Sequence, residues 1–309
     1  MDLRQAFILF LINVSMTNAQ QEVLPNSNFK KYDEKVITSL YYLDTSNSFA
    51  FNYNNSFLGL EPNRRAQIGL NLSYKFLDFS YGYSPLFLSE NKDNKDSKLF
   101  SLNTRFYHKK WMQSFTFINQ KGFYITDGQT QVEFPRLRTT KFGGSTSYIF
   151  NENFSFRTIT NQNEWQIKSA GSFIPTLSIF YTNFDLNDNN PNAKSNIYIA
   201  SLAPSYFYNL VINQQFLVSG GIAVGGGLNS IDKEIASIFE WSSSLKIDYN
   251  TDSFFTFINL NYIDFAQQSD ANIRLDDQIL TFKFTAGYRF DPPKKLKKYY
   301  DKTTQTIGL

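Results

Sequence analysis

The chain has 309 residues, of which 17% are aromatic and only 18% are charged, with a net charge of +3. Charge is therefore below the roughly 25% typical of soluble domains, yet the mean hydropathy is −0.35. Disordered chains are poor in aromatics, and multi-span helical proteins need repeated apolar runs of about 20 residues, which this chain lacks. Zero Cys and one His exclude disulfides and multi-His metal sites. The small net charge does not favour nucleic-acid binding. We expect no cofactor, metal or nucleic acid.

The N-terminus resembles an export signal. Residues 6–12 (AFILFLI) form a short apolar core, and Thr17, Asn18 and Ala19 offer a small-residue cleavage site. Such a core is too short to span a bilayer but suits a signal peptide. We expect export and cleavage after Ala19; the alternative is a buried first strand or helix.

The body of the chain alternates between apolar and polar residues. The last such run, residues 279–290, places six apolar residues on one parity: Leu280, Phe282, Phe284, Ala286, Tyr288 and Phe290. Residues 68–76, 237–249 and 254–262 repeat the pattern. Strict alternation predicts strands with one apolar and one polar face.

The length of these runs indicates the class of β protein. They are about 9 to 13 residues long, whereas strands of soluble sheets usually have about 5 or 6. A tilted membrane-spanning strand needs about 9 to 11 residues, and in lipid only a closed barrel pairs every backbone group. We predict an all-β, antiparallel transmembrane outer-membrane β-barrel in the cell outer membrane, with a soluble β-sandwich as the alternative.

The connections predict the strand number. Short ones are expected at residues 77–78, 108–110, 151–153, 213–214 and 250–252, and long ones at 59–65, 84–97, 125–137, 185–196, 228–235 and 266–277. Outer-membrane barrels alternate short periplasmic turns with longer outside loops. The alternation breaks over residues 154–184, where parity requires one strand or three. One gives 12 strands, which we prefer, and three gives 14.

The predicted domains follow from this count. They are a signal peptide (1–19), a periplasmic lead-in (20–47) with room for a short strand at Val36 to Tyr42, the barrel (48–290) and a basic periplasmic tail (291–309).

The segment from Trp165 to Pro175 does not fit an ordinary strand. Pro175 cannot donate to a strand ladder, and residues 169–172 (SAGS) are turn-like. We predict that part of this segment folds into the lumen or caps one end. The candidate lumen or plug residues are Trp165, Gln166, Lys168, Ser169, Gly171, Ser172 and Phe173.

Charged residues on the polar parity are candidates for the lumen. They are Lys75, Arg105, Lys141, Arg157, Glu240, Lys246, Asp248, Lys283 and Arg289. They either pair with one another and fill a narrow lumen or line a weakly cationic pore. The sequence leaves both open.

Two other features are read as structural. The glycines of residues 220–227 lack the Lys-Ser/Thr of a phosphate loop and suit bends or close approach of an inner element. His108 lies in a predicted turn, so we expect a solvated side chain rather than a catalytic base. No catalytic residue is proposed, and the basic run near 294–298 is interpreted as a solvated tail.

Ordered short motifs resemble one known family. They are Ser97-Lys98, Tyr107, residues 121–124 (KGFY), Phe134-Pro135, residues 148–151 (YIFN), Phe154-Ser155 with Arg157, residues 166–173 (QIKSAGSF) and 287–290 (GYRF). The chain resembles domain of unknown function family 4421, an uncharacterised envelope family of Bacteroidota. The resemblance implies an envelope or outer-membrane location and no assigned activity.

Three functions remain open at this point. The first is a channel or transporter for small solutes, the second a non-conducting structural or assembly barrel that binds envelope partners, and the third a lipid-modifying barrel enzyme that uses His108. Outer-membrane lipid is the expected surrounding in each case, and the solute is unknown.

Overall fold

The computed structural model describes residues 28–53, 56–63, 66–74, 77–88, 98–126, 131–160, 163–185, 194–232, 234–268, 273–298 and 300. Residues 28–290 form one compact unit, and the described part of the tail belongs to a second. Residues 294–298 of the tail are helical. The predicted signal peptide lies outside the described residues. No helix in the described ranges is long and apolar enough to cross a membrane.

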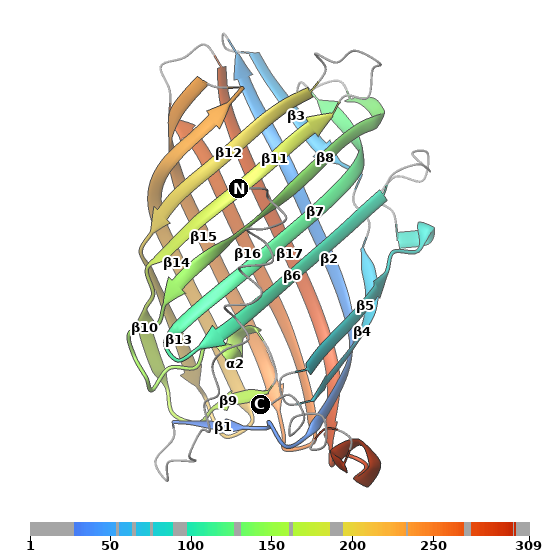
Figure 1. Ribbon diagram of the computed structural model, residues 1–309, viewed down its shortest axis with the longest axis vertical. Helices are drawn as coiled ribbons and strands as arrows, with labels where there is room; N and C mark the ends of the chain where they lie inside the picture. The colour runs from blue at the N-terminus through green and yellow to red at the C-terminus, as the bar shows by residue number, and fades with distance from the viewer. Residues whose placement is uncertain are drawn as a thin grey trace. The chain divides into compact units, whose positions relative to one another are not determined.

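Ten antiparallel strands close a barrel, as predicted for the fold class (Figure 1). They pair in the order β14-β12-β11-β8-β7-β3-β2-β17-β16-β15, and β15 returns to β14. These ring strands are β2 (Val36–Tyr53), β3 (Ser56–Pro62), β7 (Trp111–Thr126), β8 (Gln131–Tyr148), β11 (Thr176–Asp185), β12 (Lys194–Ala203), β14 (Phe216–Ile231), β15 (Glu234–Asn250), β16 (Phe254–Gln268) and β17 (Ile273–Phe290).

Five more strands extend the same sheet. β4 (Gln67–Tyr74) pairs with β2, and β5 (Leu77–Tyr83) pairs with β4. β6 (Lys98–His108) pairs with β7. β13 (Ser205–Val211) pairs with β14, and β10 (Ala170–Phe173) pairs with β13. A short 3-10 turn, η1 (Leu86–Leu88), follows β5.

The closed ring has ten strands, fewer than the twelve predicted; twelve is instead the number of passes that the described chain makes through the sheet. β3 and β4 run along the same partner, β2. β10 leads into β11 across Ile174 and Pro175, and β12 leads into β13 across Pro204. Fifteen described strands in this sheet less these three breaks give twelve passes. A proline removes a ladder donor, which explains two of the breaks.

Several predicted boundaries differ from the structure. The wall begins at Val36, not at residue 48, and β3 occupies most of the predicted loop at 59–65. Strand residues also cover much of 125–137, 228–235 and 266–277. Near these ends apolar side chains such as Leu137, Phe265 and Leu275 point inward, so the inner face is no longer the polar one.

The outer face carries two rows of touching aromatic rings. Trp111, Tyr148, Phe150 and Phe173 form one, with successive centroids 5.0, 5.0 and 5.7 Å apart. It lies towards the turns at 109–110, 213–215 and 251–253, here called the short-turn end. Nearer the opposite end, Tyr181 lies 5.2 Å from Phe142 and 4.9 Å from Tyr198. Exposed aliphatic side chains lie between the rows: Leu177, Ile179 and Leu202. An apolar band flanked by aromatics is typical of a membrane barrel.

Apolar side chains also fill the inside of the barrel towards the opposite end. One cluster of buried residues, here called the apolar layer, takes members from nine of the ten ring strands: Phe49, Leu60, Phe123, Leu137, Phe180, Phe184, Ile197, Ile199, Ile238, Phe265 and Leu275. Ile231 of β14 packs against it. Strands from all sides of the ring therefore meet across its axis at this level.

Candidate functional site

The described residues of 151–169 lie between wall strands β8 and β10, and they occupy the short-turn end of the barrel. They contain α2 (Arg157–Thr160) and β9 (Glu164–Gln166). β9 pairs with β1 (Phe29–Lys31), and this two-stranded sheet lies across the end of the barrel with α2 beside it (Figure 1). We call the described residues of 151–169 together with β1 the cap. Trp165 anchors it: the side chain is 4% exposed, and Nε1 donates to the Gln214 carbonyl at 3.2 Å.

Gln166 organises the cap. Its Nε2 donates to the carbonyl oxygens of Asn153 and Lys168, at 2.7 and 2.9 Å. Its Oε1 accepts from the Ser155 backbone N–H at 2.9 Å and from Asn209 Nδ2 at 3.1 Å. Asn209 lies on β13, so one buried amide joins the cap to the wall. A buried amide with all its partners present holds a single geometry.

A buried charge pair meets α2 from the far wall. Lys246 and Asp248 of β15 are 0% exposed at their side chains and lie 2.8 Å apart. Lys246 Nζ also donates to the Thr158 carbonyl at 2.7 Å, and its ammonium lies 4.1 Å from the Phe257 ring centroid. The last turn of a helix exposes unpaired carbonyls, and Lys246 satisfies one of them.

Arg157 and Tyr107 connect α2 to β6. The Arg157 guanidinium stacks 4.8 Å from the Tyr107 ring, and it forms an ion pair with Glu164 at 3.6 Å. The Tyr107 hydroxyl is 2.7 Å from the Thr160 hydroxyl. Glu164 also accepts from the Ser155 hydroxyl at 2.6 Å. The positive charge of Arg157 is thus paired with the carboxylate of Glu164 inside the cap.

β1 and Tyr32, which follows it, are tied to the wall by a cation and a carboxylate. Arg289 of β17 stacks 3.9 Å from the Tyr32 ring. Lys30 donates to Asp252 at 2.5 Å in the turn between β15 and β16. That hydrogen bond holds the pKa of the Asp252 carboxyl below its ordinary value of 3.8. These two contacts therefore hold β1 and the residue that follows it to the wall.

A second charge pair crosses the apolar layer. Lys141 of β8 and Asp277 of β17 are 2.5 Å apart and almost fully buried. Three strands separate β8 from β17 on one side of the ring and five on the other. The Lys141 ammonium lies 5.5 to 6.0 Å from three ring centroids, those of Phe49, Phe180 and Phe265. Asn47 donates to the second Asp277 oxygen at 2.8 Å.

The predicted plug motif is divided between the cap and the wall. Trp165 and Gln166 are buried in β9, while Lys168 and Ser169 are exposed. Ser169 Oγ accepts from the Val211 N–H at 2.9 Å. Gly171, Ser172 and Phe173 belong to wall strand β10. The turn-like interpretation of SAGS was wrong from Ala170 onwards, because those residues pair with β13.

The predicted lumen charges lie in different parts of the structure. Lys141, Glu240, Lys246, Asp248 and Arg289 are buried inside the barrel. Lys283 lies half-buried over the Tyr41 ring at 4.9 Å. Arg157 lies in the cap, Arg105 is exposed on β6, and Lys75 falls outside the described residues. Sequence reasoning missed Asp277 and Glu164. The position of Asp277 at the end of a supposed loop concealed that it faces the lumen.

The remaining predicted features lie at the surface or in the wall. His108 is exposed at the end of β6. Among the glycines of 220–227, Gly221 lies under the Phe207 ring, where an added Cβ would come within 2.1 Å of Cδ1. That is the close approach expected of a glycine in a strand.

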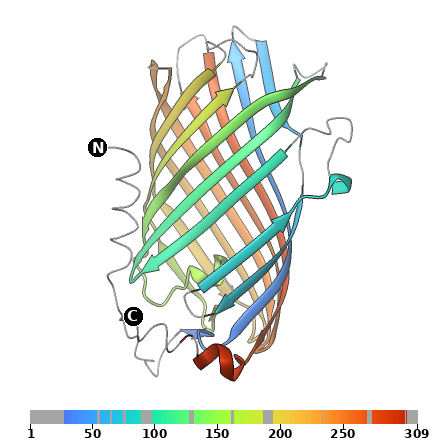
Figure 2. The ribbon, with the colours of Figure 1, turned by 45° about the vertical axis from the view of Figure 1, so that its right-hand side comes forward.

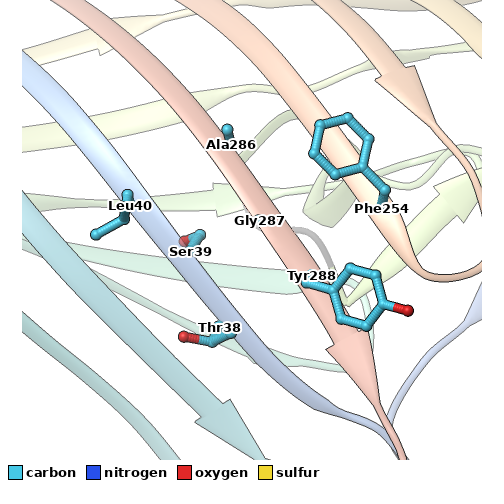
Figure 3. A pocket seen from close by; sticks show the side chains of 7 residues that line it. All are labelled: Thr38, Ser39, Leu40, Phe254, Ala286, Gly287 and Tyr288. Atoms are coloured by element: carbon cyan, nitrogen blue, oxygen red, sulfur yellow. The ribbon is translucent and has the colours of Figure 1, made fainter.

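A shallow pocket of about 280 Å³ lies on the outer wall rather than in the lumen (Figure 3). Ala286 and Gly287 form its floor, and Leu40, Phe254 and Tyr288 stand around it. These three larger side chains are exposed. The pocket is therefore a shallow depression in the apolar outer surface of the wall.

The chain matches one protein family and is distantly similar to solved outer-membrane proteins. The family described as Domain of unknown function (DUF4421) matches residues 27–290. OmpT, an outer membrane protein of Vibrio cholerae, is 12% identical, with a TM-score of 0.31 over 87% of this chain and 100% of its own. An outer membrane channel of Pseudomonas putida F1 is 10% identical, with a TM-score of 0.35 over 87% of this chain and 100% of its own. No curated protein matches the chain.

Proposed function

The chain belongs to the family described as domain of unknown function (DUF4421), and we propose that it is a gated outer-membrane channel that is closed along its axis at rest. The observation that carries the proposal is the pair of seals within one barrel. The apolar layer closes the lumen towards the opposite end, and the cap closes it at the short-turn end. We further propose export by the signal peptide at residues 1–19, with the short-turn end in the periplasm.

The outer surface supports placement in a membrane. Large apolar side chains lie exposed on strands all around the barrel, for example Leu70, Ile179, Ile222 and Phe284. A soluble monomer rarely exposes contiguous apolar patches larger than a few hundred Å². In the outer membrane the same side chains contact lipid, and the two aromatic rows lie at the levels where rings favour the interface.

The two seals differ in chemistry. The apolar layer excludes water because its members touch across the axis, and hydrophobic constrictions gate by dewetting. The cap combines apolar anchors with a polar network of Gln166, Asn209 and Ser155. Water can replace hydrogen bonds of this kind when the segment moves. We therefore assign the moving part to the cap and the solute filter to the apolar layer.

Planar-bilayer recordings test the two seals together. In one variant a short Gly-Ser linker replaces residues 154–168; in a second, Phe49→Ser and Phe265→Ser open the apolar layer. We expect the wild type and each single variant to stay silent and the combined variant to conduct, because either seal blocks ions alone. The double substitution Ile179→Ser and Leu202→Ser on the outer wall is the matched control, and it should not conduct with the cap removed.

Three results would overturn parts of the proposal. Steady conductance of the wild type would contradict the closed resting state. Conductance on removal of the cap alone would show that the apolar layer is not a seal. A silent combined variant that still migrates as a folded barrel would favour a structural barrel over a channel.

A further inference from the structure

The barrel wall has a seam between β5 and β6. In the part of the chain that the structure describes, β5 pairs with β4 alone and β6 pairs with β7 alone. β3 joins β2 to β7 only over Gly59 to Pro62 and their partners, so the ring closes above the seam. Figure 2 shows β6 beside β7 and the β4–β5 hairpin beside β2.

The seam lies within the apolar band. Phe100, Leu102 and Phe106 of β6 are 58, 47 and 45% exposed, and Tyr81 and Tyr83 of β5 are 64 and 63% exposed. β5 and β6 each leave one edge without a partner strand among the described residues, so the wall is interrupted at this level of the band.

The inner side of β6 differs from the other strands around it. Asn103 and Arg105 share the inward parity of Tyr107, yet both are exposed in the middle of the strand. Inward residues near the middle of the ring strands are buried or half-buried. Asn103 and Arg105 are thus accessible on the inner side of β6, beside the seam.

Polar groups line the inner mouth of the seam. Thr116 donates to Asn103 at 2.8 Å, and the hydroxyls of Ser114 and Ser145 lie 2.6 Å apart. Ser114 is the register partner of Arg105. Neighbouring Arg157 forms an ion pair with Glu164. Arg105, in contrast, has no ion pair with another described residue.

We propose that the seam binds a long-chain fatty acid dissolved in the membrane. The acyl chain lies between the β5 and β6 edges against Phe100, Leu102 and Phe106, and the carboxylate reaches Arg105 inside. Arginine suits this role because its planar fork binds carboxylates with two parallel hydrogen bonds. The inference rests on the barrel lying in the membrane and names an occupant for the proposed channel.

Photolabelling tests the site directly. The full chain in lipid nanodiscs is illuminated with a palmitic-acid probe that carries a diazirine near its methyl end, and with the methyl ester of the same probe. We expect adducts on Phe100 to Phe106 and on Tyr81 to Tyr83. Arg105→Gln should weaken binding of the acid about tenfold, the loss of one charge-assisted contact, and leave the ester unchanged. Arg105→Lys keeps the charge but not the planar fork, so it should restore only part of the binding.

Arg136→Gln is the matched control, since Arg136 is exposed on the outer parity of β8. It should change neither probe. Adducts spread evenly around the barrel, or unchanged acid binding in Arg105→Gln, would overturn the site. Trp111 fluorescence in brominated lipid distinguishes the two levels of failure: quenching with no seam adducts refutes the seam alone, and no quenching refutes the membrane placement beneath it.

Discussion

The buried pair of Lys141 and Asp277 provides the sharpest test of the closed lumen. Asp277→Leu removes the carboxylate 2.5 Å from the Lys141 ammonium and leaves that ammonium almost fully buried. Breaking a buried pair from one side costs about 3 to 5 kcal/mol. Three phenyl rings within 6.0 Å of the ammonium offset part of this loss, since a desolvated cation–π contact contributes about 2 kcal/mol. We expect a loss of about 3 kcal/mol, or roughly a hundredfold in the unfolding constant.

The assay is urea unfolding in lipid vesicles, followed by tryptophan fluorescence and by the gel shift between boiled and unboiled samples. The double variant Asp277→Leu with Lys141→Met should recover to within about 1 kcal/mol of the wild type, because no charge stays buried. A single variant as stable as the wild type would show that water reaches Lys141. That result would refute the dry apolar layer.

Three further predictions use the same preparations. Gly287→Ala should destabilise the barrel by about 1 to 3 kcal/mol in the urea assay, because the added Cβ would come within 2.2 Å of Phe255 Cζ. Gly220→Ala is the control and should be close to neutral, since its Cβ would have one neighbouring atom, at 3.9 Å. Gln166→Leu should speed amide exchange of residues 154–168 about a hundredfold, since several cap hydrogen bonds are lost, while exposed Lys168→Ala should leave exchange unchanged. The contact of Lys30 with Asp252 is present above pH 3.8 and is lost as the pH falls through the lowered pKa of Asp252. Amide exchange of residues 28–31, corrected for intrinsic rates, should therefore rise at low pH in the wild type and be insensitive to that step in Asp252→Asn; equal pH responses would exclude this contact as the anchor.

The sequence predicted the membrane half of the wall because one rule governs it there. In 279–290 and 254–262 the apolar parity faces outward, and Leu280, Tyr288 and Ile258 are 41, 50 and 40% exposed. Lipid outside and polar groups inside impose a period of two. The same rule correctly placed Lys246 and Asp248 in the interior.

The rule fails where the barrel contacts itself across its axis. Phe49, Phe180 and Phe265 lie in one cluster although they are far apart in the sequence, and no local pattern reports such a contact. The partners of the cap were hidden for the same reason: Gln166 and Asn209 meet only in the closed fold.

The three tryptophans test most directly the central claim, that the chain is a closed membrane barrel. Each tryptophan reports on a different environment. Trp111 is 47% exposed in an outer aromatic row, Trp241 lies on the outward parity of β15, and Trp165 is 4% exposed in the cap. Single-tryptophan variants in vesicles are exposed to brominated lipid and, separately, to aqueous iodide. A closed membrane barrel predicts that brominated lipid quenches Trp111 and Trp241 while Trp165 is shielded from both quenchers. Quenching of Trp165 by iodide, or quenching of Trp111 and Trp241 by iodide in place of lipid, would contradict it.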